Sequence, residues 1–228
     1  MDDRPAILQL LNEQLARATA MRAAAGADPA LAETRARLRG VQADRLARTH
    51  ADLLASPRFG KAAAFFLSDI YGPRDLGPLY AETGKVVPVM ARLLPTAGLS
   101  TVAHAIELDA LSEDLDLAVA RAMGTAKPDA AAYRRAYRQV GRRPDRERQI
   151  RLVETLGATI DHLARLPLIG RTLRMMRLPA RLAGLGDLQD FLERGYAAFH
   201  GTADVDEFLR LITTREWAAM EALFAAAA

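Results

Sequence analysis

His104 and Glu107 are one helical turn apart, and their side chains can exchange a proton. Leu108, Leu111 and Leu115 repeat at helical spacing, which predicts a helix over residues 101–123 with His104 near the centre of its apolar face. An imidazole beside a carboxylate in a partly dry place can act as an acid and a base, or can bind a small ligand. The alternative is a buried histidine that a neighbouring carboxylate satisfies for purely structural reasons.

Glu216 is a second unusual residue, because it lies on the apolar face of the helix predicted over residues 205–224. An ionised carboxylate in an apolar core must be paired, since burying it alone is costly. Arg45 lies among apolar residues of the helix predicted over residues 28–56. We therefore expect a buried Arg45–Glu216 ion pair, with His104 and Glu107 as further members of a candidate ligand site. A purely structural ion pair is the alternative.

Signatures of metal, cofactor and nucleophile chemistry are missing from the sequence. The chain has no cysteine, and none of its four histidines belongs to a Glu-x-x-His or HExxH pattern. A single inward histidine such as His104 suffices to ligate haem iron, but no second feature supports haem. Phosphate-binding glycine loops and the GxSxG nucleophile pattern are absent as well. The sequence therefore predicts no metal ion and no cofactor, and it favours a non-enzymatic protein over an enzyme.

Residues 169–185, IGRTLRMMRLPARLAGL, form a basic amphipathic segment that contains no acid. Its arginines share one helical face, and its apolar residues take the rest. The arginines are Arg171, Arg174, Arg177 and Arg181, and the apolar residues include Leu173, Met175, Met176 and Leu182. Such a helix can dock on an acidic protein or on another anionic surface. The alternative is a helix that packs its apolar side and leaves its arginines in solvent.

Arginines are concentrated between Tyr133 and Arg181, where 13 arginines and four acids give a local charge of +9 in a chain of net charge +3. Arginine forks suit phosphate groups, so nucleic-acid binding is a third reading. Tyr133 and Tyr137 are the only aromatic residues between these arginines that could stack on bases, which makes nucleic acid the less favoured partner.

The elements that position these residues are predicted to be helices throughout. Apolar residues recur at helical spacing and no run alternates, so we expect an all-α protein with one compact domain over residues 1–228. Cap residues and prolines predict about ten segments, several of them kinked or short, at about 2–26, 28–56, 59–70, 75–95, 100–123, around Tyr133 and Tyr137, 146–166, 172–183, 188–200 and 205–224. The predicted caps are Asp28, Asp75, Ser100, Asp187 and Asp204. Without an apolar run of about 18 residues we expect no membrane span, and without a secretory signal we expect a cytoplasmic protein.

Residues 65–75 read FFLSDIYGPRD. This string resembles the signature of an uncharacterised bacterial family known by its FFLEELY motif, with Ser68 and Asp69 in place of the two glutamates and Ile70 in place of leucine. The stretches HAIELDALSEDLD, MMRLPARLAGLGDLQDFLERGYAAF and ITTREW also resemble that family. The resemblance implies a helical bacterial protein with no known activity, and it supplies no catalytic residues.

Packing and turn formation explain the motif without any chemistry. Its aromatic and aliphatic residues anchor a short helix, Gly72 and Pro73 end it, and Asp75 caps the next one. The motif residues are Phe65, Phe66, Leu67, Asp69, Tyr71, Gly72, Pro73 and Asp75. The alternative is that Asp69, Tyr71 and Arg74 project into a cleft. The sequence as a whole favours a binding module that uses the arginine-rich face, ahead of an interior small-molecule site and of nucleic-acid binding.

Overall fold

The computed structural model describes residues 4–70, 87, 96–124, 129–165, 168–182, 186–202 and 204–225. The described residues form ten α-helices and one π-helical segment and contain no strand, which confirms the all-α fold. The elements are α1 (Arg4–Gly26), α2 (Pro29–Thr49), α3 (Ala51–Ala55), α4 (Gly60–Phe65), η1 (Phe66–Ile70), α6 (Thr96–Met123), α7 (Ala130–Val140), α8 (Arg143–Ala164), α9 (Ile169–Leu182), α10 (Gly186–Phe199) and α11 (Val205–Phe224).

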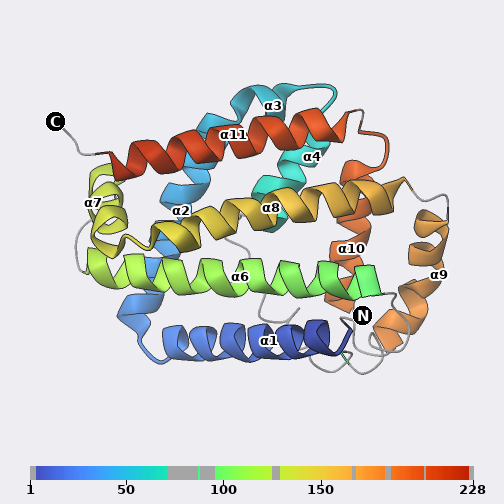
Figure 1. Ribbon diagram of the computed structural model, residues 1–228, viewed down its shortest axis with the longest axis horizontal. Coiled ribbons are helices and arrows are strands. Elements are labelled where there is room, and N and C mark those ends of the chain that lie inside the picture. The colour runs from blue at the N-terminus through green and yellow to red at the C-terminus, as the bar shows by residue number, and fades with distance from the viewer. Residues whose placement is uncertain are drawn as a thin grey trace.

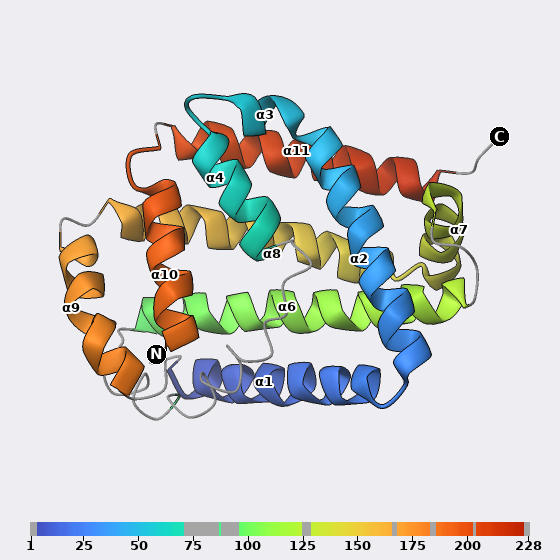
Figure 2. The ribbon, with the colours of Figure 1, turned by 180° about the vertical axis from the view of Figure 1, so that it is seen from behind.

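Helices α6, α8 and α11 run lengthwise through the molecule, and α1 lies along α6 (Figure 1). Helix α2 crosses them on the opposite side, as the reverse view shows (Figure 2). Helices α7 and α9 lie at opposite ends of the long axis in both views. Helix α9 packs mainly on α10, with a small contact to α8, so it forms one end of the molecule. None of the described helices is both long enough and apolar enough to cross a membrane.

An aspartate is the N-cap of three of the described helices, because its short carboxylate can accept hydrogen bonds from the free backbone amides of the first turn. Asp28 accepts from the amides of Ala30 and Leu31 and precedes Pro29, and Asp204 accepts from the amide of Glu207. Both caps confirm the sequence prediction. Asp129 caps α7 in the same way.

Several predicted boundaries are wrong, among them the starts of two helices, because α8 begins at Arg143 instead of about Arg146 and α9 begins at Ile169 instead of about Thr172. Helix α6 begins at Thr96 instead of Ser100, because Leu99 is fully buried and its packing favours an additional turn. Asp187 lies in the first turn of α10 and not before it. The second predicted helix is interrupted at His50, where α2 ends and α3 begins.

The largest apolar cluster joins the FFLSDIY stretch to α8, α10 and α11. Phe65 packs against Phe191 and Phe199, and Phe66 packs edge-on against Phe208. Phe65 and Phe66 are buried, and Leu67 is half-buried. Phe65 thus ends α4 in the core, and the following motif residues, Phe66–Ile70, form a π-helical turn instead of the α-helix that the spacing predicts.

Asp69 is the buried polar residue of the motif. Its carboxylate accepts hydrogen bonds from Arg194 of α10 at 3.0 Å and from Ser68 at 2.8 Å. The partner of Asp69 thus comes from another helix. Outside the described residues lie Tyr71, Gly72, Pro73, Arg74 and Asp75, together with the helix predicted over 75–95 except for Val87.

Gly157 marks the closest approach of α8 to α11. A Cβ atom on Gly157 would lie 2.1 Å from Cδ2 and 3.0 Å from Cγ of Leu209, which is itself buried in the core. We expect Gly157→Ala to lower the free energy of unfolding by about 1–3 kcal/mol through overpacking. Gly40 of α2 has open space around it, so Gly40→Ala should raise stability by about 0.5–1 kcal/mol. Urea unfolding of both variants tests this, and equal effects would contradict the close approach.

Candidate functional site

Large apolar side chains are exposed at one end of the molecule. Among the described residues these are Leu168, Met175, Met176, Leu178, Leu182 and Leu192. Five of them belong to α9 or directly precede it, and Leu192 lies on the neighbouring helix α10. Met175 is 72% exposed and Leu182 is 80% exposed, so these side chains have almost no cover. Exposed apolar residues gathered in one place mark interaction surfaces.

Helix α9 points its apolar residues away from the protein. At 100° per residue, Met175, Leu178 and Leu182 fall within one narrow face, whereas the buried residues Gly170 and Ala180 fall on the other side. The expected alternative, a helix that packs its apolar side and solvates its arginines, therefore does not describe α9. We call the surface formed by Leu168, Arg171, Arg174, Met175, Leu178 and Leu182 the α9 surface.

The four arginines of α9 have two different environments. Arg177 donates to both oxygens of Glu193 at 2.6–2.9 Å, and Arg181 lies 3.6 Å from Asp190. The Arg177 hydrogen bond lowers the pKa of Glu193 to about 2. Arg171 and Arg174 are exposed and form no ion pair among the described residues. Acids of α10 thus neutralise half of the arginine face, which the sequence of the segment alone did not reveal.

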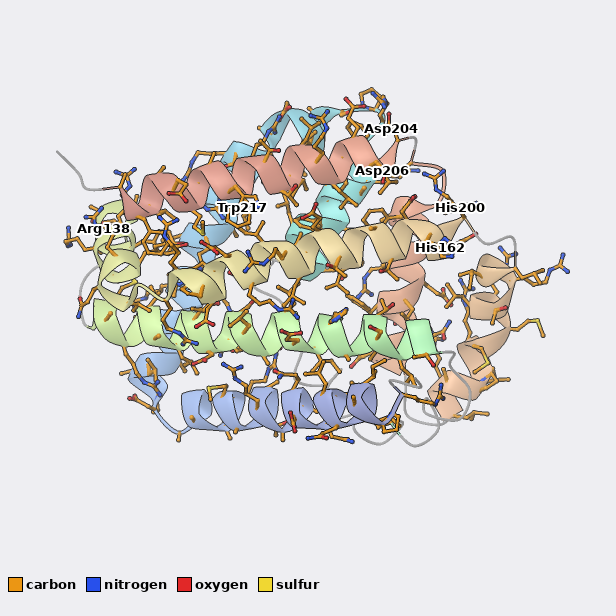
Figure 3. All side chains as sticks on the ribbon, in the orientation of Figure 1. Arg138, His162, His200, Asp204, Asp206 and Trp217 are labelled. Carbon is orange, nitrogen blue, oxygen red and sulfur yellow. The ribbon has the colours of Figure 1, made fainter. Side chains whose placement is uncertain are left out.

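A hollow of about 390 Å³ separates α9 from α10. Its lining is Gly170, Leu173, Arg174 and Arg177 from α9, with Glu193, Tyr196, Ala197 and His200 from α10 and the residue after it. His200 lies at the C-terminal end of α10 (Figure 3). Its ring stacks on Tyr196 with 4.7 Å between centroids and 18° between planes.

Several other arginines of the basic stretch pair with acids elsewhere in the chain. Arg142 binds Asp114 and Arg143 binds Glu221, and neither acid lies in the stretch. Among the described residues, seven of its 13 arginines form ion pairs, namely Arg142, Arg143, Arg148, Arg151, Arg165, Arg177 and Arg181. Five of these arginines, namely Arg142, Arg143, Arg148, Arg177 and Arg181, bind acids outside the stretch and so offset five of its nine excess positive charges.

Arg45 and Glu216 form the predicted ion pair. Two guanidinium nitrogens donate to the two carboxylate oxygens at 3.0 and 2.7 Å. His50, which is 0% exposed, places Nε2 3.0 Å from Oε1 of Glu216. Burial alone raises the pKa of Glu216, but the hydrogen bonds from His50 and Arg45 and the Arg45 charge outweigh burial and lower it.

Glu113 of α6 is the centre of a second buried cluster. It is 1% exposed, and its carboxylate forms ion pairs with Arg22 of α1 and with Arg35 and Arg39 of α2. Nη2 of Arg22 lies 3.5 Å from Oε1 of Glu113, and Nη2 of Arg35 lies 2.5 Å from Oε2 of Glu113. Helices α1 and α2 are thus joined to α6 through one carboxylate.

Asp116, one turn after Glu113, continues this cluster toward α7. It accepts from Gln42 at 2.9 Å, and burial raises its pKa despite the attraction of Arg39. The buried guanidinium of Arg146 lies 4.4 Å above the ring of Tyr137, whose pKa burial raises to about 12. These side chains form an internal network between α2, α6, α7 and α8.

His104 and Glu107 do not form the expected pair with each other. Glu107 instead accepts two hydrogen bonds from Arg148 of α8, both at 2.8 Å. His104 is half-buried and has no hydrogen-bond or ion-pair partner among the described residues. No described contact links either residue to Arg45 or Glu216. A ligand site that combines the four residues stays a prediction.

Two acids that the sequence did not indicate, Glu113 and Asp116, lie on a second buried face of α6. The spacing predicts one apolar face for this helix, whereas α1, α2, α7 and α8 all pack against α6. The available signal for this second face was three further apolar residues of the helix, Ala103, Ile106 and Leu117, which are buried outside the predicted face. Glu113 and Asp116 share this second face, which is why their charges need internal partners.

The described residues contain no group of three His, Cys, Asp or Glu side chains that could hold a metal ion. No curated protein and no solved structure matches the chain. A family model described as a domain of unknown function, DUF8198, matches residues 21–228. That range includes α2 and every later element, and an uncharacterised family is what the FFLSDIY resemblance implied. The chain belongs to the DUF8198 family.

Proposed function

We propose that the protein is a non-enzymatic binding module that docks an acidic protein partner on the α9 surface. The observation that carries this proposal is the outward apolar face of α9, bordered by two arginines that have no internal ion pair among the described residues. Exposed methionine and leucine are costly in water and become favourable when a partner covers them.

The chemistry of α9 supports an acidic protein as the partner. Helix α9 contains four arginines, no lysine and no acid, and arginine and methionine are enriched at protein interfaces whereas lysine is depleted. A partner helix or groove with apolar residues flanked by carboxylates would complement both parts of the surface. The internal ion pairs of the basic stretch weigh against nucleic acid, because among the described residues they occupy seven of its 13 arginines.

A designed peptide probe tests the proposal with the full-length chain. The probe is a 21-residue amphipathic peptide with leucine on one helical face and glutamate on the other, and its control carries lysine in place of glutamate. Calorimetry should show binding of the glutamate peptide only, with affinity that decreases when sodium chloride is raised. The double substitution Met175→Ser and Leu178→Ser should weaken binding at least tenfold without unfolding the protein, because both side chains are exposed.

A matched pair of charge variants locates the binding site. Arg171→Gln with Arg174→Gln should weaken binding of the glutamate peptide at least fivefold. Arg134→Gln with Arg135→Gln, an exposed arginine pair on α7 at the other end of the molecule, should leave it unchanged. Equal losses in the two variants would overturn the α9 surface as the site. Tighter binding to phosphatidylserine vesicles than to the peptide would overturn the protein partner in favour of a lipid surface.

A further inference from the structure

The hollow between α9 and α10 is lined by apolar and aromatic groups. Leu173 and Ala197 supply aliphatic carbon, and Tyr196 and His200, whose rings stack on each other, form its aromatic wall. Its volume of about 390 Å³ is at the lower end of the range for small-ligand pockets. An aromatic side chain inserted there would contact these rings, and aromatic pairs favour both offset-stacked and edge-to-face contacts.

Gly170 fixes the position of this aromatic wall. A Cβ atom at position 170 would lie 2.5 Å from the hydroxyl oxygen and 2.7 Å from Cζ of Tyr196. The tyrosine ring can therefore lie against the backbone of α9 only because residue 170 has no side chain. The hollow thus depends on a specific close approach between α9 and α10.

The charges around the hollow favour an anion. Its lining contains two guanidinium groups and one carboxylate. Arg177 is held by Glu193, and Glu193 also accepts from Gln189 at 2.7 Å, so that carboxylate already has its donors. Arg174 forms no ion pair among the described residues and therefore has donors available for an incoming carboxylate. Arg174 is four residues from Gly170 and from Leu178, which places it between the hollow and the exposed apolar face.

We propose that this hollow is an anchor pocket for an aromatic side chain that stands beside a carboxylate in the partner. The aromatic ring packs on Tyr196, His200 and Leu173, and the carboxylate binds Arg174. This inference rests on the proposed function, and it specifies which residues the acidic partner presents. Anchors of this kind contribute much of the affinity of a protein interface.

Small probes test the pocket separately from the α9 surface. N-acetyl-phenylalanine, as its carboxylate, is titrated into isotope-labelled protein and followed by NMR, with N-acetyl-phenylalaninamide as the uncharged control. The carboxylate should shift the ring signals of Tyr196 and His200 and the methyl signals of Leu173, and should bind at least fivefold more tightly than the amide. N-acetyl-leucine should bind less tightly than N-acetyl-phenylalanine.

Three variants separate the contributions of shape and charge. Arg174→Gln should remove the preference for the carboxylate and keep weak aromatic binding, whereas Gly170→Ala should weaken both probes by displacing Tyr196. Arg134→Gln, which changes an exposed arginine on α7 at the other end of the molecule, should change neither. Equal binding of carboxylate and amide to the native protein, or shifts confined to other residues, would overturn the anchor pocket.

The two proposals fail in distinguishable ways. If the glutamate peptide binds and N-acetyl-phenylalanine does not, the α9 surface stands and the anchor pocket is wrong. If N-acetyl-phenylalanine binds and the peptide does not, the protein partner is wrong, and with it the role of the pocket as an anchor.

Discussion

Glu113→Ala should lower the free energy of unfolding by about 3–5 kcal/mol, one of the two largest effects that we expect from a single substitution. Glu113 is nearly inaccessible and forms ion pairs with arginines of α1 and α2. Without its carboxylate, three largely buried guanidinium groups remain beside an apolar methyl group. A protein of this kind has a total stability of about 5–15 kcal/mol, so the variant should be close to unfolding.

An exposed ion pair provides the control for Glu113. Glu33 and Arg37 are four residues apart on α2, and both side chains are more than half exposed. Glu33→Ala should change stability by no more than about 0.5 kcal/mol, because solvent screens such pairs. Urea unfolding followed by circular dichroism and by the fluorescence of Trp217, the single tryptophan on α11, would measure both variants (Figure 3). Similar losses in the two variants would show that burial does not strengthen the Glu113 cluster.

Glu216→Gln should destabilise the protein by about 3 kcal/mol at pH 7 and by much less at pH 3. The pKa of Glu216 is lowered from 4.5 in the folded protein, so the charged form stabilises the fold. That stabilisation is fully present above the ordinary pKa of a glutamate and is lost as the pH falls through the lower, folded pKa. The glutamine variant cannot lose it, because its side chain does not titrate.

The pH series compares the unfolding free energies of the native protein and the variant between pH 3 and 7. The native protein should lose stability more steeply on acidification, so that the two curves approach each other at the acid end. Acidification changes the contribution of Asp116 to the unfolding free energy in the opposite direction, because the pKa of Asp116 is raised in the folded protein. This contribution is the same in the native protein and in the variant. A difference that stays constant over the series would contradict a lowered pKa for Glu216.

The helical architecture was predictable because its signals are local. Asp28 and Asp204 cap helices where the sequence places them, and α11 has the predicted bounds. The Arg45–Glu216 pair was predictable from a different argument, namely that two charges on apolar faces require each other. His50 was missed because it lies at the break between α2 and α3, which no proline or glycine marks.

The rest of the candidate site depends on which helices become neighbours. Glu107 looked like a partner for His104 within one helix, but α8 brings Arg148 to it. The acids that neutralise Arg177 and Arg181 come from α10, and the sequence of α9 contains no trace of them. The exposure of Met175 and Leu178 likewise follows from the position of α9 at the end of the molecule, since a periodic apolar face indicates packing in most helices.

The ion pairs around Glu113 and Glu216 have a consequence for alkaline conditions. Their cationic members are arginines, apart from the histidine beside Glu216, and the whole chain has only three lysines. A guanidinium group keeps its proton at pH values where a lysine ammonium group loses it. Acid can therefore disrupt the arginine pairs by protonating their carboxylates, whereas base leaves the attraction between guanidinium and carboxylate intact.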